Sequence, residues 1–161
     1  MTWRIEALPL DPFTRYFAMT DAELAEVGAR RMIADAPNSA PCRVSLRDAD
    51  VGDALILVNH AHLTAPSSPY RQAGPIFVRE IAEQSPAFVD AVPDMVSTRL
   101  VSARAFDRDA MMLDADVVPG ADLAPRLDQW FADPAVDQVQ IHTARRGCYL
   151  ARAVRQEMSL P

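Results

Sequence analysis

The chain has 161 residues, half of them hydrophobic and 24% charged, and its formal net charge is −6 at neutral pH. This length fits a single domain, and this composition is typical of a globular protein that needs neither a metal nor a disulfide to fold. A pI of about 5.0 disfavours nucleic acid and anionic membranes as partners, because both repel an acidic protein. All 16 basic residues are arginine, which excludes a catalytic lysine.

No apolar run approaches the roughly 20 residues that cross a bilayer, and the first residues lack the basic and apolar stretches of a signal peptide. We therefore expect a cytoplasmic protein with no membrane partner. The two cysteines, Cys42 and Cys148, are too few for a disulfide scaffold and are expected as thiols, although a bond between them stays open if their strands adjoin. The sequence fixes neither a cofactor nor an oligomeric state.

The first half of the chain is predicted to contain two helices and four strands. Thr20 and Glu23 have the spacing of a capping box at the start of the second helix, and Gly28 follows its end. The apolar run 54–59 predicts a central strand covered on both faces, and the prolines of 61–73 predict a loop. The other predicted strands are 3–8, 31–34 and 42–46, and the predicted helices are 12–19 and 21–27.

The second half continues with strands that arrive in pairs. Asp107 to Ala110 form a turn signal between two apolar segments, which predicts a hairpin. Gly147 marks a second turn, between the last two predicted strands. Paired strands with intervening helices predict an α+β fold, a single domain with a mainly antiparallel sheet and helices packed against it. The predicted strands are 74–80, 100–106, 111–118, 136–143 and 148–154, and the predicted helices are 93–98 and 121–131.

Three stretches of the sequence occur together in one known pattern. They are PCRVSLRDA at 41–49, SPYR at 68–71 with GPIFVR at 74–79, and HTA at 142–144 with GCY at 147–149. The chain thereby resembles, over nearly its whole length, a bacterial family catalogued as domain of unknown function 1203. The resemblance implies a single-domain cytoplasmic protein and implies no activity. The chain departs from the family pattern at His60, where tyrosine is common, and at Thr143, where asparagine is common.

The three histidines form the first candidate site. His60 and His62 are two residues apart after the apolar strand, so in an extended segment they point to the same side, and His142 ends another strand. Three imidazoles with one open position are the ligand set of a catalytic zinc site. The alternative is that all three are ordinary histidines bonded to the backbone, and the departure at His60 favours that alternative. The sequence therefore assigns no metal, with His60, His62 and His142 as the residues to inspect.

The cysteines form a second candidate site. A nucleophilic thiolate needs a nearby cation or base, and Arg43, His62 and His142 are available in the sequence to Cys42 or Cys148. The alternative is that both cysteines are small buried apolar residues, since a free cysteine is among the most buried residue types. No CxxC motif favours redox chemistry.

The loop around 68–75 is the third candidate. It combines prolines and a glycine with Tyr70 and Arg71, and a planar guanidinium suits a carboxylate or phosphate. Arg43 and Arg79 could complete an anion clamp, and on an acidic protein such a cluster selects a small anion over a polymer. The alternative is that Arg71 and Arg79 form structural ion pairs with Glu80 or aspartates.

The hypothesis that follows is a domain that binds a small anionic molecule where 41–43, 70–77 and 142–148 converge. Its candidate binding residues are Arg43, His62, Tyr70, Arg71, Arg79 and His142. Two alternatives stay open: an enzyme that uses Cys42 or Cys148 with a histidine, or a histidine-bound metal, and a structural domain whose loop contacts another protein. The sequence has no GxGxxG, Walker or GxSxG motif, so the common nucleotide cradles and hydrolase elbows are not expected.

Overall fold

The fold is known from a computed structural model, which describes residues 2–156. Six strands form one sheet: β1 (Trp3–Glu6), β7 (Phe88–Val89), β8 (Leu100–Phe106), β9 (Met112–Pro119), β10 (Gln138–Thr143) and β11 (Tyr149–Arg155). Their order is β7-β1-β11-β10-β8-β9, and every neighbouring pair is antiparallel. The predicted hairpin around Asp107–Ala110 is confirmed as β8 and β9.

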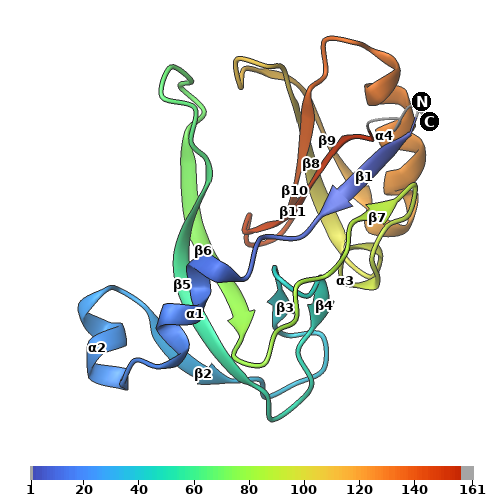
Figure 1. The fold of residues 1–161 in the computed structure, drawn as a ribbon. Helices are drawn as coiled ribbons and strands as arrows, with labels where there is room; N and C mark the ends of the chain where they lie inside the picture. Colours follow the sequence, from blue (N-terminus) through green and yellow to red (C-terminus); the bar gives the residue numbers. More distant parts are fainter. Residues whose placement is uncertain (1, 157–161) are drawn as a thin grey trace, which may run out of the picture.

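Five strands form the second sheet: β2 (Arg30–Ile33), β3 (Pro41–Cys42), β4 (Arg47–Asp48), β5 (Ala54–Leu63) and β6 (Gln72–Arg79). Their order is β2-β5-β6-β3-β4, and only the contact of β3 with β6 is parallel. The long hairpin of β5 and β6 stands beside the six-stranded sheet, and its tip lies at the same end as the β8–β9 turn (Figure 1). The predicted α+β class with mainly antiparallel strands is confirmed.

Helices pack against one face of each sheet. The helix α4 (Leu123–Ala132), which follows the short turn η1 (Gly120–Asp122), buries Leu127 and Phe131 against the six-stranded sheet. The helices α1 (Asp11–Phe17) and α2 (Asp21–Glu26) pack Phe13 and Leu24 against the five-stranded sheet. The capping box of Thr20 at the start of α2 is present as predicted. No helix within residues 2–156 is long and apolar enough to cross a membrane.

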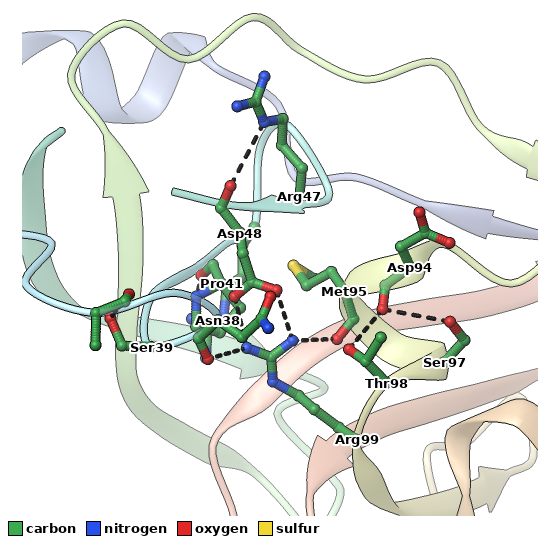
Figure 2. A network of polar contacts seen from close by, with 12 residues as sticks. Asn38, Ser39, Pro41, Arg47, Asp48, Asp94, Met95, Ser97, Thr98 and Arg99 are labelled. Carbon is green, nitrogen blue, oxygen red and sulfur yellow. Dashed lines mark hydrogen bonds and ion pairs between the residues drawn. The ribbon is translucent and has the colours of Figure 1, made fainter. Parts of the chain in front are cut away.

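An arginine joins the two sheets at one end of the molecule (Figure 2). Arg99 follows the helix α3 (Asp94–Ser97) and reaches Asp48 of β4, where Nη2 and Nη1 lie 2.5 and 2.8 Å from the two carboxylate oxygens. Nη2 also donates to the carbonyl oxygen of Asn38 at 2.8 Å. Both charged side chains are about 15% exposed or less, so this bidentate ion pair is largely removed from water. We call it the Arg99 joint.

The strand β9 is one of the two edge strands of the six-stranded sheet, and β7 is the other. The backbone N–H groups of Ala115 and Val117 donate at 2.8 Å to the carboxylates of the residues before them, Asp114 and Asp116. Both carboxylates are held in turn by Arg126 of α4. Two backbone donors of this edge strand are therefore occupied within the chain.

Two predicted segments are wrong. Of the predicted strand 42–46, only Cys42 is extended, and residues 43–46 form a turn in which Leu46 has a φ of +48°. Val44 and Leu46 are buried inside this turn, so their alternation imitated a strand. The predicted loop 61–73 begins only after Leu63, because β5 continues through His60 and Ala61, which pair with Gly74 and Ala73 of β6.

Candidate functional site

The tip of the β5–β6 hairpin is fastened to the six-stranded sheet by Ser68. This side chain is 2% exposed; its hydroxyl donates to the carbonyl oxygen of Ala110 at 2.7 Å and accepts from the N–H of Tyr70 at 3.0 Å. Leu63, Phe106 and Ala110 form a small apolar cluster under this contact. The segment that carries Tyr70 and Arg71 is therefore held in place rather than hanging free.

A hollow of about 280 Å³ lies beside this fastening. It is lined by residues of the hairpin tip and of the hairpin β8–β9: Pro69, Tyr70, Arg71, Gln72, Arg104, Phe106 and Met112. We call it the hairpin-tip hollow. Tyr70 meets Phe106 edge to face, with ring centroids 6.0 Å apart. The hollow is thus lined by two aromatic rings and by two guanidinium groups, that of Arg71 from the β5–β6 loop and that of Arg104 from β8.

Neither guanidinium in the hollow is paired with a carboxylate among residues 2–156. Arg104 donates from Nη1 to Gln72 Oε1 at 3.2 Å and from Nε to Ser102 Oγ at 3.4 Å, and Arg71 is exposed and makes no ion pair with any described residue. Burial lowers the pKa of Arg104, as expected where no counter-charge offsets lost hydration. Two uncompensated cations on one hollow create a local attraction for an anion.

Arg104 also borders a polar cluster between the sheets. Its neighbour on β10, Gln140, donates from Nε2 to the backbone oxygen of His62 at 2.8 Å. Gln140 Oε1 lies 2.7 Å from His62 Nδ1. His62 is on β5 and Gln140 is on β10, so one buried amide links the two sheets by two hydrogen bonds. We call His62, Gln140, His142 and Tyr149 the inter-sheet cluster.

The aromatic rings of this cluster pack closely. His62 stacks on Tyr149 with centroids 5.0 Å apart and planes at 13°, and His142 meets His62 edge-on at 5.0 Å. The ring centroid of His60 lies 6.4 Å from that of Tyr149 and 5.7 Å from that of Phe13 of α1. All three histidines of the chain therefore surround one tyrosine.

The hydrogen bonds determine which ring nitrogens carry protons. The carbonyl oxygen of Gly147 can only accept, so His142 Nδ1, at 3.0 Å, is the protonated nitrogen of the neutral ring. The carbonyl oxygen of His62 likewise fixes the orientation of Gln140, so His62 Nδ1–H donates to Oε1. His142 Nε2 lies 3.4 Å from Gln140 Oε1, a longer contact than the 3.0 Å of Nδ1 to Gly147, so the shorter contact takes the single proton of the neutral His142 ring.

Burial keeps these imidazoles neutral. Desolvation lowers the pKa of His142 to about 4, and the nearby Arg104 and His62 oppose protonation further. Desolvation also lowers the pKa of His62 and of His60, and it raises the pKa of the Tyr149 hydroxyl. At neutral pH the cluster is uncharged, and the positive charge of this region resides on the arginines.

The structure places the other two predicted anion-clamp arginines elsewhere. Arg43 is 2% exposed; its Nε donates to the carbonyl oxygen of Tyr149 at 2.7 Å, and its Nη1 donates to that of Pro41. Arg79 is 6% exposed and forms an ion pair with Asp53 at 2.7 Å. Burial lowers the pKa of Arg43 to about 10. Both guanidinium groups are bonded within the protein, whereas Tyr70 and Arg71 line the hollow.

The two cysteines are separate free thiols. Cys42 is fully buried and its sulfur accepts from the backbone N–H of Arg79 at 3.4 Å. Cys148 is partly exposed, and its sulfur lies 4.0 Å from the carbonyl oxygen of Arg146. Within residues 2–156 neither sulfur is hydrogen-bonded to a histidine. The cation near both sulfurs is Arg43, whose pKa they help to raise against the lowering caused by burial.

The histidines do not form a metal-binding group. Across the described part of the chain, no three histidine, cysteine or acidic side chains are grouped so that they could hold one ion. The Nδ1 atoms of His62 and His142 are engaged with oxygen acceptors, Gln140 Oε1 and the carbonyl oxygen of Gly147.

A second and larger hollow, of about 390 Å³, lies near the Arg99 joint. Pro37, Asn38, Arg47, Asp48, Ala49, Asp50 and Val51 line it. Its arginine, Arg47, is paired with Asp50 at 2.6 Å, and its remaining carboxylate, Asp48, is held by Arg99. The charges in this hollow are neutralised by each other, so the larger volume is a poorer fit to an anion.

Sequence reasoning missed Gln72, Arg104, Gln140 and Tyr149. Gln140 is two residues before His142 on a strand and so shares its face, which is a signal that the sequence carries. Arg104 gives no such signal, because only the packing of the two hairpins brings it to Arg71.

The comparisons with known proteins agree with the sequence pattern. A family model described as protein of unknown function, DUF1203, matches residues 39–155. This range contains every residue of the hairpin-tip hollow and of the inter-sheet cluster. No curated protein and no solved structure matches the chain.

Proposed function

We propose, for this chain that belongs to the domain of unknown function 1203 family, that it binds a small anionic molecule in the hairpin-tip hollow. The observation that carries the proposal is the pair Arg71 and Arg104, which line one hollow without a carboxylate partner among the described residues. An acidic protein with 22 carboxylates and 16 arginines could neutralise both. Arg104 is partly buried and loses hydration without a carboxylate to offset the loss, and an anionic ligand would supply that counter-charge.

The two arginines would have different tasks. Arg104 is partly buried and is held by Gln72 and Ser102, so it would present a fixed guanidinium to the anion. Arg71 is exposed and would close on the anion from the other side. The Ser68 fastening keeps the loop of Arg71 close to the strand of Arg104, which reduces the ordering cost of binding.

Titration with inorganic phosphate, followed by NMR chemical shifts and calorimetry, tests the proposal. We expect shifts in Gln72, Arg104 and Tyr70, and affinity weakened at least about tenfold in Arg71→Ala, because the substitution removes one of two cations. Arg71 makes no bond within the described fold, so the melting temperature should stay unchanged.

Arg30→Ala is the matched control. Arg30 is also exposed and unpaired among the described residues, but it lies on β2, which pairs with β5 far from the hairpin tip (Figure 1). Both variants remove one positive charge. Equal weakening by the two variants, or phosphate shifts spread over the surface instead of the hollow, would refute the proposal.

A further inference from the structure

Part of the lining of the hairpin-tip hollow is apolar. Pro69, Tyr70, Phe106 and Met112 line it together with the arginines. Phe106 is 2% exposed and belongs to the cluster under the tip, whereas 39% of Tyr70 is exposed. A site for a bare inorganic anion has no use for an exposed aromatic ring, since such a ring contributes nothing to a fully hydrated ion.

The position of Tyr70 is determined by the fold. Its N–H donates to Ser68 Oγ, and its ring rests edge to face on Phe106. This edge-to-face contact leaves the rest of the Tyr70 ring free to receive a second flat group, by stacking or edge contact. A guanidinium also stacks on planar rings, so Arg71 could cover the same group.

The volume limits the size of the guest. At about 280 Å³ the hollow falls just below the range of roughly 300–1,000 Å³ typical of pockets for drug-sized ligands. One ring with one charged head fits this space, and a dinucleotide does not. The two guanidinium groups favour a head with at least two oxygens.

We propose that the ligand of the hairpin-tip hollow is a small anion that carries a single planar apolar ring, such as an aryl phosphate or an aryl carboxylate. Arg71 and Arg104 bind the oxygens of its head, and the ring lies against Tyr70, Pro69 and Met112. This inference rests on the proposed function, because it describes the uncharged part of the anion that the arginines bind.

The test compares phenyl phosphate with inorganic phosphate at about pH 8, above the second pKa of a phosphate monoester near 6. Both probes have the same charged head, so the ratio of their affinities isolates the ring. We expect phenyl phosphate to bind at least about tenfold more tightly, because burial of a ring removes apolar surface from water. Equal affinities would overturn the inference and leave the proposed function standing. Binding of neither probe would overturn both.

Two variants of Tyr70 locate the effect. Tyr70→Phe keeps the ring and should keep the affinity ratio, whereas Tyr70→Ala removes the ring and should reduce the ratio to a few-fold. Circular dichroism of both variants verifies that they fold. A ratio that stays high in a folded Tyr70→Ala would place the ring of phenyl phosphate elsewhere and refute the assignment.

Discussion

The two sheets contact each other at two ends of the molecule, and the arginines at these ends differ in whether a carboxylate pairs with them. At the Arg99 joint, the guanidinium is matched by both oxygens of Asp48 and by a backbone carbonyl. At the hairpin tip, Arg71 and Arg104 share a hollow with no carboxylate from the described chain. The first arrangement holds the sheets together, because a buried cation without its partner is costly. The second leaves charge available to something outside the chain.

The largest expected effect is at the joint. Asp48→Ala should lower the free energy of unfolding by about 3 kcal/mol, because it leaves the mostly buried guanidinium of Arg99 without a counter-charge. Urea unfolding followed by circular dichroism measures the change. The double variant Asp48→Ala with Arg99→Met should recover part of the loss. A loss below about 1 kcal/mol would show that the joint is no more than a surface ion pair.

A smaller effect on the free energy of unfolding is expected at His142, in the inter-sheet cluster. The folded ring has a pKa of about 4 because of its burial, whereas an unfolded histidine takes up a proton below about 6.5. Stability is therefore complete above pH 6.5, falls as the pH decreases, and loses nothing more from this group below about 4. The slope is at most about 1.4 kcal/mol per pH unit, or about 2 kcal/mol by pH 5.

Urea unfolding at pH 7 and pH 5 tests this dependence in the unaltered chain and in His142→Gln. The difference between the two pH values should be about 2 kcal/mol smaller in the variant. Each protein is its own reference, so a general loss of stability in the variant does not disturb the comparison. Equal pH dependence in both would mean that His142 is protonated in the folded protein.

The smallest effect should have the opposite sign to that at the joint. Arg104→Met removes a partly buried cation that has no carboxylate partner among residues 2–156 and keeps an unbranched apolar stem in its place. The free energy of unfolding should stay unchanged or rise by up to about 1 kcal/mol. Phosphate binding should be lost in the same variant. Destabilisation as large as that of Asp48→Ala would mean that Arg104 supports the fold as Arg99 does.

Local signals in the sequence were sufficient for much of the fold. The capping box of Thr20 and the turn at Asp107–Ala110 are each decided by residues close in sequence, and both are present. The strand β5 was predicted too short, because His60 and His62 break the apolar run. Those histidines are nevertheless extended, since His60 pairs with Gly74 of β6 and Gln140 binds His62. That support comes from 78 residues away.

The difference between local signals and contacts distant in sequence also applies to the candidate site. Tyr70 and Arg71 were recognised from a loop whose own composition suggested binding, and they line the hollow. The tasks of Arg43 and Arg79 depend on Tyr149 and Asp53, which are 106 and 26 residues away. Chemistry alone cannot tell a paired arginine from an available one. The tertiary packing decides which arginines are paired and which are available.

The occupied edge of β9 has a consequence for how copies of the chain meet one another. An open edge strand invites a strand from another molecule to add to the sheet, which is a common first step in aggregation. Here Asp114 and Asp116 cover the N–H groups of Ala115 and Val117, and Arg126 of α4 holds both carboxylates in that position. A strand arriving at this edge would meet negative charge where it needs donors. Through Arg126, the helix α4 that packs on the core also disfavours the addition of a strand at this one edge of the sheet.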